Sequence, residues 1–136
     1  MIGDAIFARL STNSPVAAVV GTRIYPEVST ENVYPLIVYA AEPAGETCLG
    51  PPSRLRQYAL AVTCEARTYQ GAQDLAAIVK AALSKTDGVC EYWGDTVTVQ
   101  SCIYENATDG HDTDDANPER IFYFCEQTYS LWARTS

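Results

Sequence analysis

The feature that most constrains the fold of this chain is a strictly alternating segment, residues 55–66, that leads almost directly into an amphipathic one, residues 68–84. Alternation with period two is typical of a strand with one buried face. The buried face is predicted to carry Tyr58, Leu60, Val62 and Cys64. The second segment repeats its apolar residues at helical spacing, namely Ala72, Leu75, Ala76, Val79, Ala82 and Leu83. An apolar sheet face and an apolar helix stripe bury each other, so the two segments predict an α+β fold.

The other face of the alternating strand is unusual because two of its side chains are very small. It carries Gln57, Ala59, Ala61, Thr63 and Glu65. Small side chains allow another backbone to approach closely. We therefore expect Ala59 and Ala61 to face a close neighbour, such as a second subunit.

Helical segments are also expected both before and after this strand. Ile2, Ile6 and Leu10 recur every four residues and predict an N-terminal helix over 2–12. Ser14-Pro15 resembles the start of a second, short helical segment that Gly21 ends. Thr68 can cap the long amphipathic helix, and Asp87-Gly88 can end it.

Four further strands are predicted from β-branched, aromatic and alternating residues: 22–25, 36–41, 96–103 and 121–132. Val97 and Val99 are expected to point inward. The segments 42–53, rich in Pro and Gly, and 109–118, rich in Asp, are predicted to be long loops. The expected fold is one α+β domain over residues 1–136. Its mostly antiparallel sheet has about four to five strands, with an N-terminal helix and one long amphipathic helix packed on it.

Composition excludes several classes of protein. The chain has 136 residues and a net charge of −8, from 17 acidic and nine basic residues. Such a balance argues against binding of a nucleic-acid backbone, whose affinity comes mainly from Lys and Arg. No apolar run approaches the ~20 residues of a membrane helix, and residues 1–10 do not resemble a signal peptide. We expect a protein made in the cytoplasm of its producing cell, without membrane contact.

The cysteine pattern predicts neither disulfide bonds nor a metal site. The five cysteines are spaced in a way that fits neither a disulfide scaffold nor a zinc site. Cys64, Cys102 and Cys125 fall in predicted strands, where a reduced thiol fills the core as a small apolar group. Cys48 falls in a predicted loop, where it would be exposed.

Candidate chemistry is sparse. His111, the single histidine, lies in the acidic stretch 109–115, where Asp112 and Asp114 begin a calcium-loop pattern that Ala116 breaks. A solvated acidic loop is favoured over a weak divalent-cation site. No nucleophile elbow or P-loop is present, and no carboxylate pair converges. We therefore expect no catalytic residues, no cofactor and no enzyme activity.

The ordered set of motifs resembles the tail-completion, or tail-terminator, proteins of long-tailed bacteriophages. The resemblance covers almost the whole chain. It begins with a helix that ends in Val19-Val20-Gly21, followed by Thr22-Arg23-Ile24-Tyr25-Pro26 and Tyr34-Pro35-Leu36-Ile37-Val38-Tyr39. The Tyr58–Cys64 strand, the Ala/Leu-rich helix and Tyr129-Ser130-Leu131-Trp132 follow in order. The acidic segment 109–115 is not part of the resemblance.

The resemblance implies a structural protein at the head–tail junction of a virion, assembled in the host cytoplasm. Identical subunits would form a ring, expected to be a hexamer, that caps the tail tube at its head-proximal end. The tail tube protein and a head–tail connector or stopper protein would be its partners. Genomic DNA would pass through the ring without sequence-specific binding. Residues expected at subunit contacts are Leu49, Arg54, Arg56, Ala59, Ala61, Asp109, Asp112, Asp114 and Asp115.

Three alternatives remain open at this point. The chain could instead be a neck protein on the head side of the junction. It could be a small-molecule-binding α+β module, because nine tyrosines could line a pocket as well as a core or an interface. It could also be a calcium-dependent binding domain that uses the acidic loop.

Overall fold

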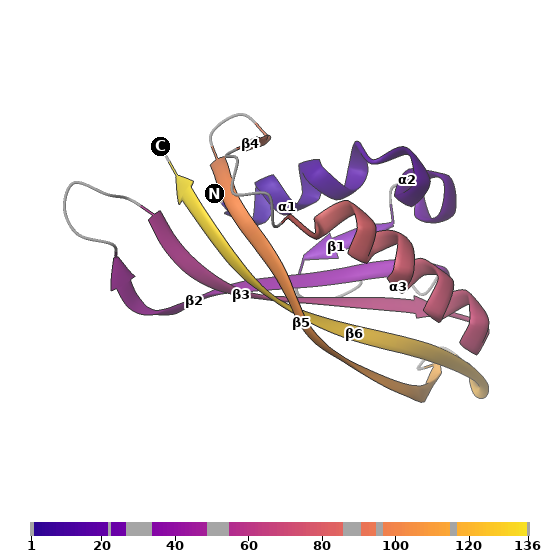
Figure 1. Ribbon diagram of the computed structural model, residues 1–136. Helices are drawn as coiled ribbons and strands as arrows, with labels where there is room; N and C mark the ends of the chain where they lie inside the picture. The colour runs from indigo at the N-terminus through magenta and orange to yellow at the C-terminus, as the bar shows by residue number, and fades with distance from the viewer. Residues whose placement is uncertain are drawn as a thin grey trace.

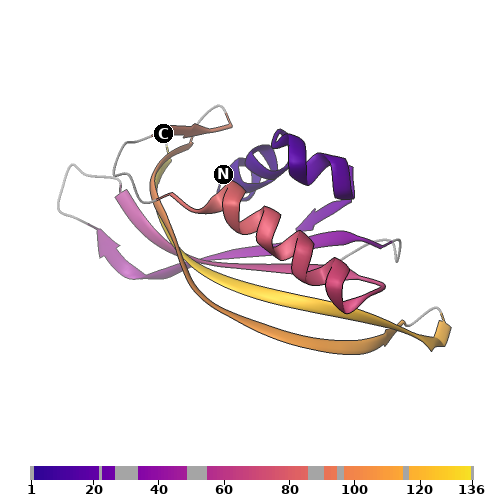
Figure 2. The same ribbon diagram turned by 45° about the vertical axis from the view of Figure 1, so that its right-hand side comes forward.

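The computed structural model describes residues 2–21, 23–26, 34–48, 55–85, 91–94, 97–114 and 117–135. It has two layers (Figure 1): a long curled sheet, and three helices that all lie on one side of it. The view turned by 45° shows the same separation of layers (Figure 2). The helices are α1 (Ile2–Ser11), α2 (Ser14–Val20) and α3 (Tyr69–Leu83). The strands are β1 (Ile24–Pro26), β2 (Leu36–Cys48), β3 (Leu55–Ala66), β4 (Glu91–Trp93), β5 (Val97–Asp114) and β6 (Asn117–Thr135).

The sheet has the order β1-β2-β3-β6-β5-β4. β1 pairs with β2 in parallel, and every other neighbouring pair is antiparallel. The α+β class is therefore confirmed, but the details differ from the expectation. The sheet is mixed and has six strands, where four to five mostly antiparallel ones were predicted, and three helices cover it. The three-residue β4 was missed because it is too short to show an alternating pattern.

The two predicted loops were wrong in the parts that the structure describes. β2 continues through Glu42 to Cys48, and β5 continues through the acidic segment to Asp114. Their partner strands explain the difference, because a long ladder supplies backbone hydrogen bonds that compensate for residues with poor strand propensity. β5 is paired with β6 up to Asp114, which pairs with Asn117. Residues 49–53 of the first predicted loop lie outside the described part.

The helix predictions were closer. α3 begins after Thr68, whose Oγ1 accepts a hydrogen bond from the Gly71 N–H at 3.0 Å. It ends at Leu83, before the predicted stop at Asp87-Gly88, which is not described. The cap of α2 is Asn13 and not Ser14, since the Asn13 side chain accepts from the Val16 N–H. Gly21, at φ 61°, ends α2 as predicted. No helix within the described residues is long and apolar enough to cross a membrane.

The core lies between the helices and the covered face of the sheet. The predicted inward positions Tyr58, Leu60, Val62 and Cys64 are all buried, as are Val97 and Val99. From the helices, Ile6, Leu10, Val16, Leu75, Val79 and Leu83 complete the same cluster. One cluster that connects all three helices to the sheet supports a single cooperative unit.

Gln127 is a polar side chain inside this core, only 3% exposed. Its Nε2 donates to the Ala76 carbonyl at 2.9 Å, and its Oε1 accepts from the Tyr129 hydroxyl at 2.7 Å. Tyr129 itself is fully buried. Gln127 thus accepts the hydrogen bond of the buried Tyr129 hydroxyl, and its own hydrogen bond to Ala76 links β6 to α3.

We predict that Gln127→Leu lowers the free energy of unfolding by about 1–3 kcal/mol, because the buried Tyr129 hydroxyl loses its acceptor. Gln57→Leu is the matched control. Gln57 is half-buried on the opposite side of the sheet and donates to Ser130 Oγ. Its replacement should change stability by less than about 0.5 kcal/mol. Urea denaturation of both variants checks the difference, and equal losses would contradict the role given to Gln127.

Candidate self-association surfaces

One face of the sheet has no covering layer within the described part of the chain. The three helices occupy the other side (Figures 1 and 2). The side chains that alternate with the core positions lie on this uncovered face. Ala59 is exposed there and Ala61 is half-buried, on neighbouring positions of β3. The structure thus brings these two predicted contact residues together on the expected face. That they meet another subunit remains a prediction.

The second surface is the part of the β5–β6 hairpin that extends away from β2–β3 (Figure 1). We call residues 112–114 and 117–122 the arm, because the pairing of β6 with β3 ends at Tyr123, opposite Ala66. Every side chain from Glu105 to Asp109 is exposed, and so are His111 and Asp112. A two-stranded ribbon without a core of its own is only marginally stable in water. An arm of this kind therefore needs support from its base.

Aromatic side chains give that support where the arm begins. Phe122 stacks on Tyr34 with ring centroids 5.2 Å apart, and the Arg67 guanidinium lies 4.4 Å from the centre of the Tyr34 ring. The Phe124 ring lies so close to Gly110 that a Cβ there would be 2.5 Å from Cζ of the ring. Glycine at 110 thus lets the ring lie flat across the neighbouring strand.

A small second core forms beside this stack on the uncovered face. Leu36 pairs with Glu65, and Glu65 pairs with Phe124, so the three lie side by side across β2, β3 and β6. Leu36 is 1% exposed even though no helix covers it. Burial raises the pKa of the Glu65 carboxyl above its usual value. The base of the arm is therefore packed.

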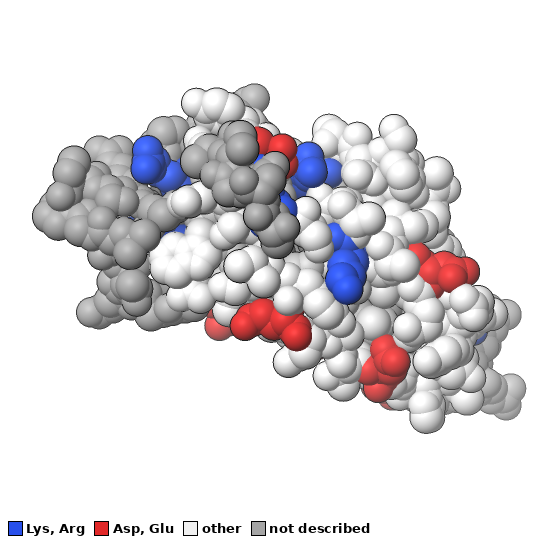
Figure 3. Space-filling view, viewed as in Figure 1, with Lys and Arg blue, Asp and Glu red and all other residues white. Residues whose placement is uncertain are grey.

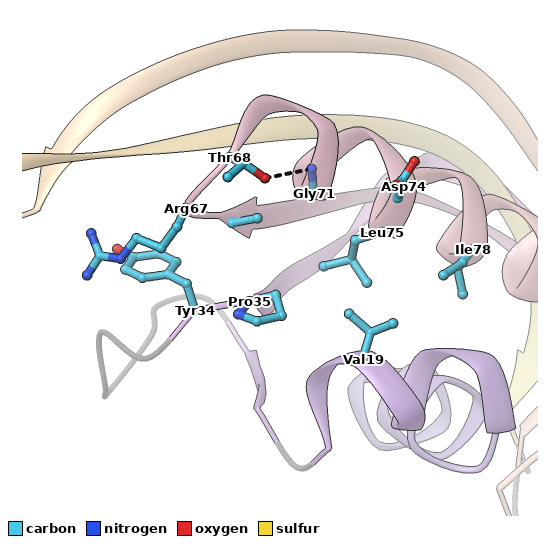
Figure 4. A pocket seen from close by; sticks show the side chains of 10 residues that line it. Val19, Tyr34, Pro35, Arg67, Thr68, Gly71, Asp74, Leu75 and Ile78 are labelled. Atoms are coloured by element: carbon cyan, nitrogen blue, oxygen red, sulfur yellow. Dashed lines mark hydrogen bonds between the residues drawn. The ribbon is translucent and has the colours of Figure 1, made fainter.

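A pocket of about 380 Å³ lies between α2, the start of β2 and α3. Figure 4 shows Val19, Leu75 and Ile78 converging on it, with Tyr34 and Arg67 at one end. Among the lining residues of this pocket that the structure describes, one is a tyrosine, Tyr34. This pocket is therefore not the tyrosine-lined pocket of the small-molecule alternative. Thr68, another lining residue, already caps α3.

Charges of opposite sign occupy different parts of the sheet. Glu105, Asp109 and Glu126 are exposed along β5 and β6 beside β3, and Asp112 is exposed on the arm. At the far end of the sheet, the exposed Arg56 and Arg134 lie on adjacent strands, since Arg56 pairs with Ala133. Figure 3 shows acidic side chains over β5 and basic ones near the end of β6. Predicted contact residues Arg56, Asp109 and Asp112 therefore belong to two separate surfaces.

The remaining predicted contact residues are only partly placed. Leu49, Arg54 and Asp115 lie outside the described residues, and Asp114 is described only by its backbone in β5. Glu105, Glu126 and Arg134 were missed by the sequence reasoning. Recognition of 97–135 as one long hairpin would have put Glu126 beside the acids of β5.

The acidic segment does not form the predicted solvated loop, nor the calcium loop kept as an alternative. Asp112 and Asp114 both belong to β5 and each has a backbone partner on β6, with a shift of register between Thr113 and Asp114. A calcium loop needs a sharp turn that brings its oxygens together. Among the residues that the structure describes, no three His, Cys, Asp or Glu side chains are grouped so that they could hold a metal ion.

Three thiols lie in the core, as predicted, whereas Cys48, predicted to lie in a loop, ends β2 and its side chain is not described. Cys64, Cys102 and Cys125 are buried and reduced. Burial raises the pKa of Cys102 to about 12 and that of Cys125 to about 11, in the second case with a contribution from Asp109. The pKa of Cys64 is raised further, again mainly by burial. Thiols in this state are poor nucleophiles.

Comparison with known proteins gives two findings. The family model described as "Tail completion protein gp17" matches residues 4–122. Among solved structures, a chain of the "Virion of native gene transfer agent (GTA) particle" is similar in fold, with a TM-score of 0.70 and 14% sequence identity. The match covers 95% of this chain and 91% of that one. The search of curated protein sequences found no match.

We predict that the native protein has at most two fast-reacting thiols at pH 8, those of Cys48 and Cys90. The chain has five cysteines, and the other three are buried with pKa values raised above the usual range. Titration with Ellman's reagent before and after denaturation in guanidinium checks this count. All five should react once the chain is unfolded. A third fast thiol in the native state would contradict the packing described here.

Proposed function

The chain belongs to the family of tail completion protein gp17, and on that premise we propose that it closes the head-proximal end of a phage tail tube as a ring of identical subunits. Membership of this family already makes the chain a structural protein of the virion tail. The ring stops addition of further tube protein and presents its other side to the head connector. A hexamer is the stoichiometry that we propose.

The observation that carries the proposal is the family match over most of the chain. The shape of the subunit supports it. One sheet face is uncovered within the described part, and a hairpin arm extends from the packed body. Different surfaces at different ends of a subunit favour heterologous contacts, which close into rings when the rotation between copies allows it.

The partners that we propose are further copies of this chain, the tail tube protein and a head–tail connector or stopper. The protein would be assembled in the host cytoplasm and remain at the head–tail junction of the virion. The net charge of −8 suits a ring through which DNA passes, because phosphates find few counter-charges on an acidic wall. A basic channel wall in the assembled ring would be incompatible with this last point.

We predict that tails made without this subunit lack a defined head-proximal end and do not join heads. Addition of the purified wild-type protein should restore head-joined tails of uniform length, because only the cap is missing. Negative-stain electron microscopy of lysates with and without the added protein measures tail length and the fraction joined to heads.

The location of the subunit separates the proposal from its main alternative. Cryo-electron microscopy should find it in direct contact with the last ring of the tail tube. A position on the head side, without contact to the tube, would instead make it a neck protein. A free monomer that is absent from particles would contradict both.

A further inference from the structure

We propose that the outer edge of β5, from Asn106 to His111, receives an extended basic segment of another protein, which joins the sheet as a further strand. The occupant carries Lys or Arg side chains and comes from a different protein, not from a second copy of this chain. The inference goes beyond the proposed function and rests on it only in so far as the source of that strand is another protein of the particle.

The outer side of β5 is open over most of its length. β4 pairs with Val97–Val99, and Lys85 forms a bridge to Cys102. Beyond Cys102, no described residue pairs with β5 on the side away from β6, and Figure 1 shows this part of the strand at the margin of the sheet. An unpaired edge offers backbone N–H and C=O groups to an incoming strand.

The open edge is held in place from its inner side. β5 pairs with β6 without a break from Asn106 to Thr113. β6 in turn is paired with β3 as far as Tyr123, which lies opposite His111. A two-stranded ribbon alone is only marginally stable, whereas this part of the edge is backed by both β6 and β3. The segment from Asn106 to His111 is therefore a supported template for a further strand.

The bridge at Lys85 shows which backbone groups of β5 face outward. The Lys85 N–H donates to the Cys102 carbonyl, and the Cys102 N–H donates to the Lys85 carbonyl, both at 2.9 Å. Cys102 therefore directs its backbone groups outward, and its partner Leu131 directs its own groups toward β3. Since these directions alternate along β6, the β5 residues opposite odd-numbered residues of β6 also face outward. In the open segment these are Ala107, Asp109 and His111.

The helical layer leaves room for an added strand there. α3 packs against β3 and β6. Its Lys80 reaches β5 at Tyr104, where Nζ lies 4.1 Å from the centre of the ring, before the open segment begins. Beyond Tyr104, the side chains from Glu105 to Asp109 are exposed on both faces of the strand.

The charges along this edge select the chemistry of the occupant. Glu105 and Asp109 are exposed on β5, and the exposed Glu126 lies on β6 opposite Thr108. Residues 103–111 contain no Lys or Arg, and Figure 3 shows acidic side chains over β5. Opposite charges on neighbouring strands stabilise their pairing, whereas like charges destabilise it. The edge therefore favours a strand with basic side chains.

The same argument disfavours a second copy of this chain. Two β5 edges side by side would bring identical acids together. The opposite edge of the sheet, along β2, is also a poor partner. The Ile37 N–H donates outward to the Arg23 carbonyl at 3.0 Å, so the odd-numbered residues of β2 face outward. Pro43 is one of them and has no N–H to donate, and its neighbour Glu42 is an exposed acid.

Hydrogen exchange followed by NMR tests whether the edge is open. In the free protein, the amides of Ala107, Asp109 and His111 should exchange at least about tenfold faster than those of Asn106 and Thr108, whose N–H groups face β6. Equal protection of the two sets would show that the edge is already covered and would overturn the inference. Protection that grows with protein concentration would identify a second copy as the occupant and would also overturn it.

Peptide binding tests the occupant. The probe is a short peptide in which lysine alternates with valine, because β-branched residues favour a strand. It should shift the amide resonances of Ala107, Asp109 and His111 saturably and slow their exchange. The same peptide with glutamate in place of lysine, and a backbone N-methylated lysine peptide, should bind at least about tenfold more weakly. Absence of saturable shifts at these amides, or equal binding of all three peptides, contradicts the inference.

Variants of the protein test the edge from the other side. Glu105→Lys with Asp109→Lys should reverse the preference, so that the glutamate peptide binds more tightly than the lysine peptide. Glu42→Lys with Asp74→Lys makes the same charge change on two exposed acids away from this edge and should bind as wild type does. Ala107→Pro removes an outward N–H and should abolish binding of both peptides. Circular dichroism melting checks each fold, and an unchanged preference in the folded charge variant of β5 would refute the proposal.

The outcome is distinguishable from that of the proposed function. If the lysine peptide binds at β5 but the subunit is never found at a tail end, the strand-receiving edge stands and the cap is wrong. If the subunit caps tails but the peptides fail to bind at β5, the cap stands and the edge inference is wrong.

Discussion

The antiparallel ladder between β3 and β6 is the constraint on which the rest of the structure depends. It runs without a break from the Leu55–Arg134 pair to the Ala66–Tyr123 pair. Register in such a ladder decides which side of the sheet each residue occupies, since a slip by one residue would exchange the faces. Here it aligns Leu60 with Tyr129 and Val62 with Gln127, so that the buried positions of both strands meet under α3.

The uncovered face and the two ends of the sheet follow from the same ladder. β6 has 19 residues and β3 has 12, so β6 extends beyond the end of β3 and forms the arm together with β5. Aromatic packing of Phe122 on Tyr34 fixes the base of that arm. Beyond Cys102, no described residue pairs with the outer edge of β5, so the backbone of this edge strand is open along the same length.

Much of the covered layer could be predicted from the sequence because the relevant signals are local. Alternation placed Tyr58, Leu60 and Val62 in the core, and helical spacing placed Leu75 and Val79 opposite them. The continuation of β5 through the acidic segment could not be predicted in this way. Asp109, Asp112 and Asp114 are poor strand formers, and only the pairing of the whole hairpin holds them extended. The pairing partner of Asp109, Cys125, is distant in the sequence, so no local pattern reveals it.

The sequence by itself determined the α+β class, the covered face of the central strands, the buried thiols and the absence of a recognisable catalytic motif. These properties depend on periodicity and residue type, which a chain carries along its length. Only the tertiary structure decided that the acidic segment is a strand, and that its acids lie beside β6 while Arg56 and Arg134 lie on adjacent strands elsewhere in the sheet. Those properties depend on which distant strands pair and in what register, because non-local hydrogen bonding overrides the local preference of each segment.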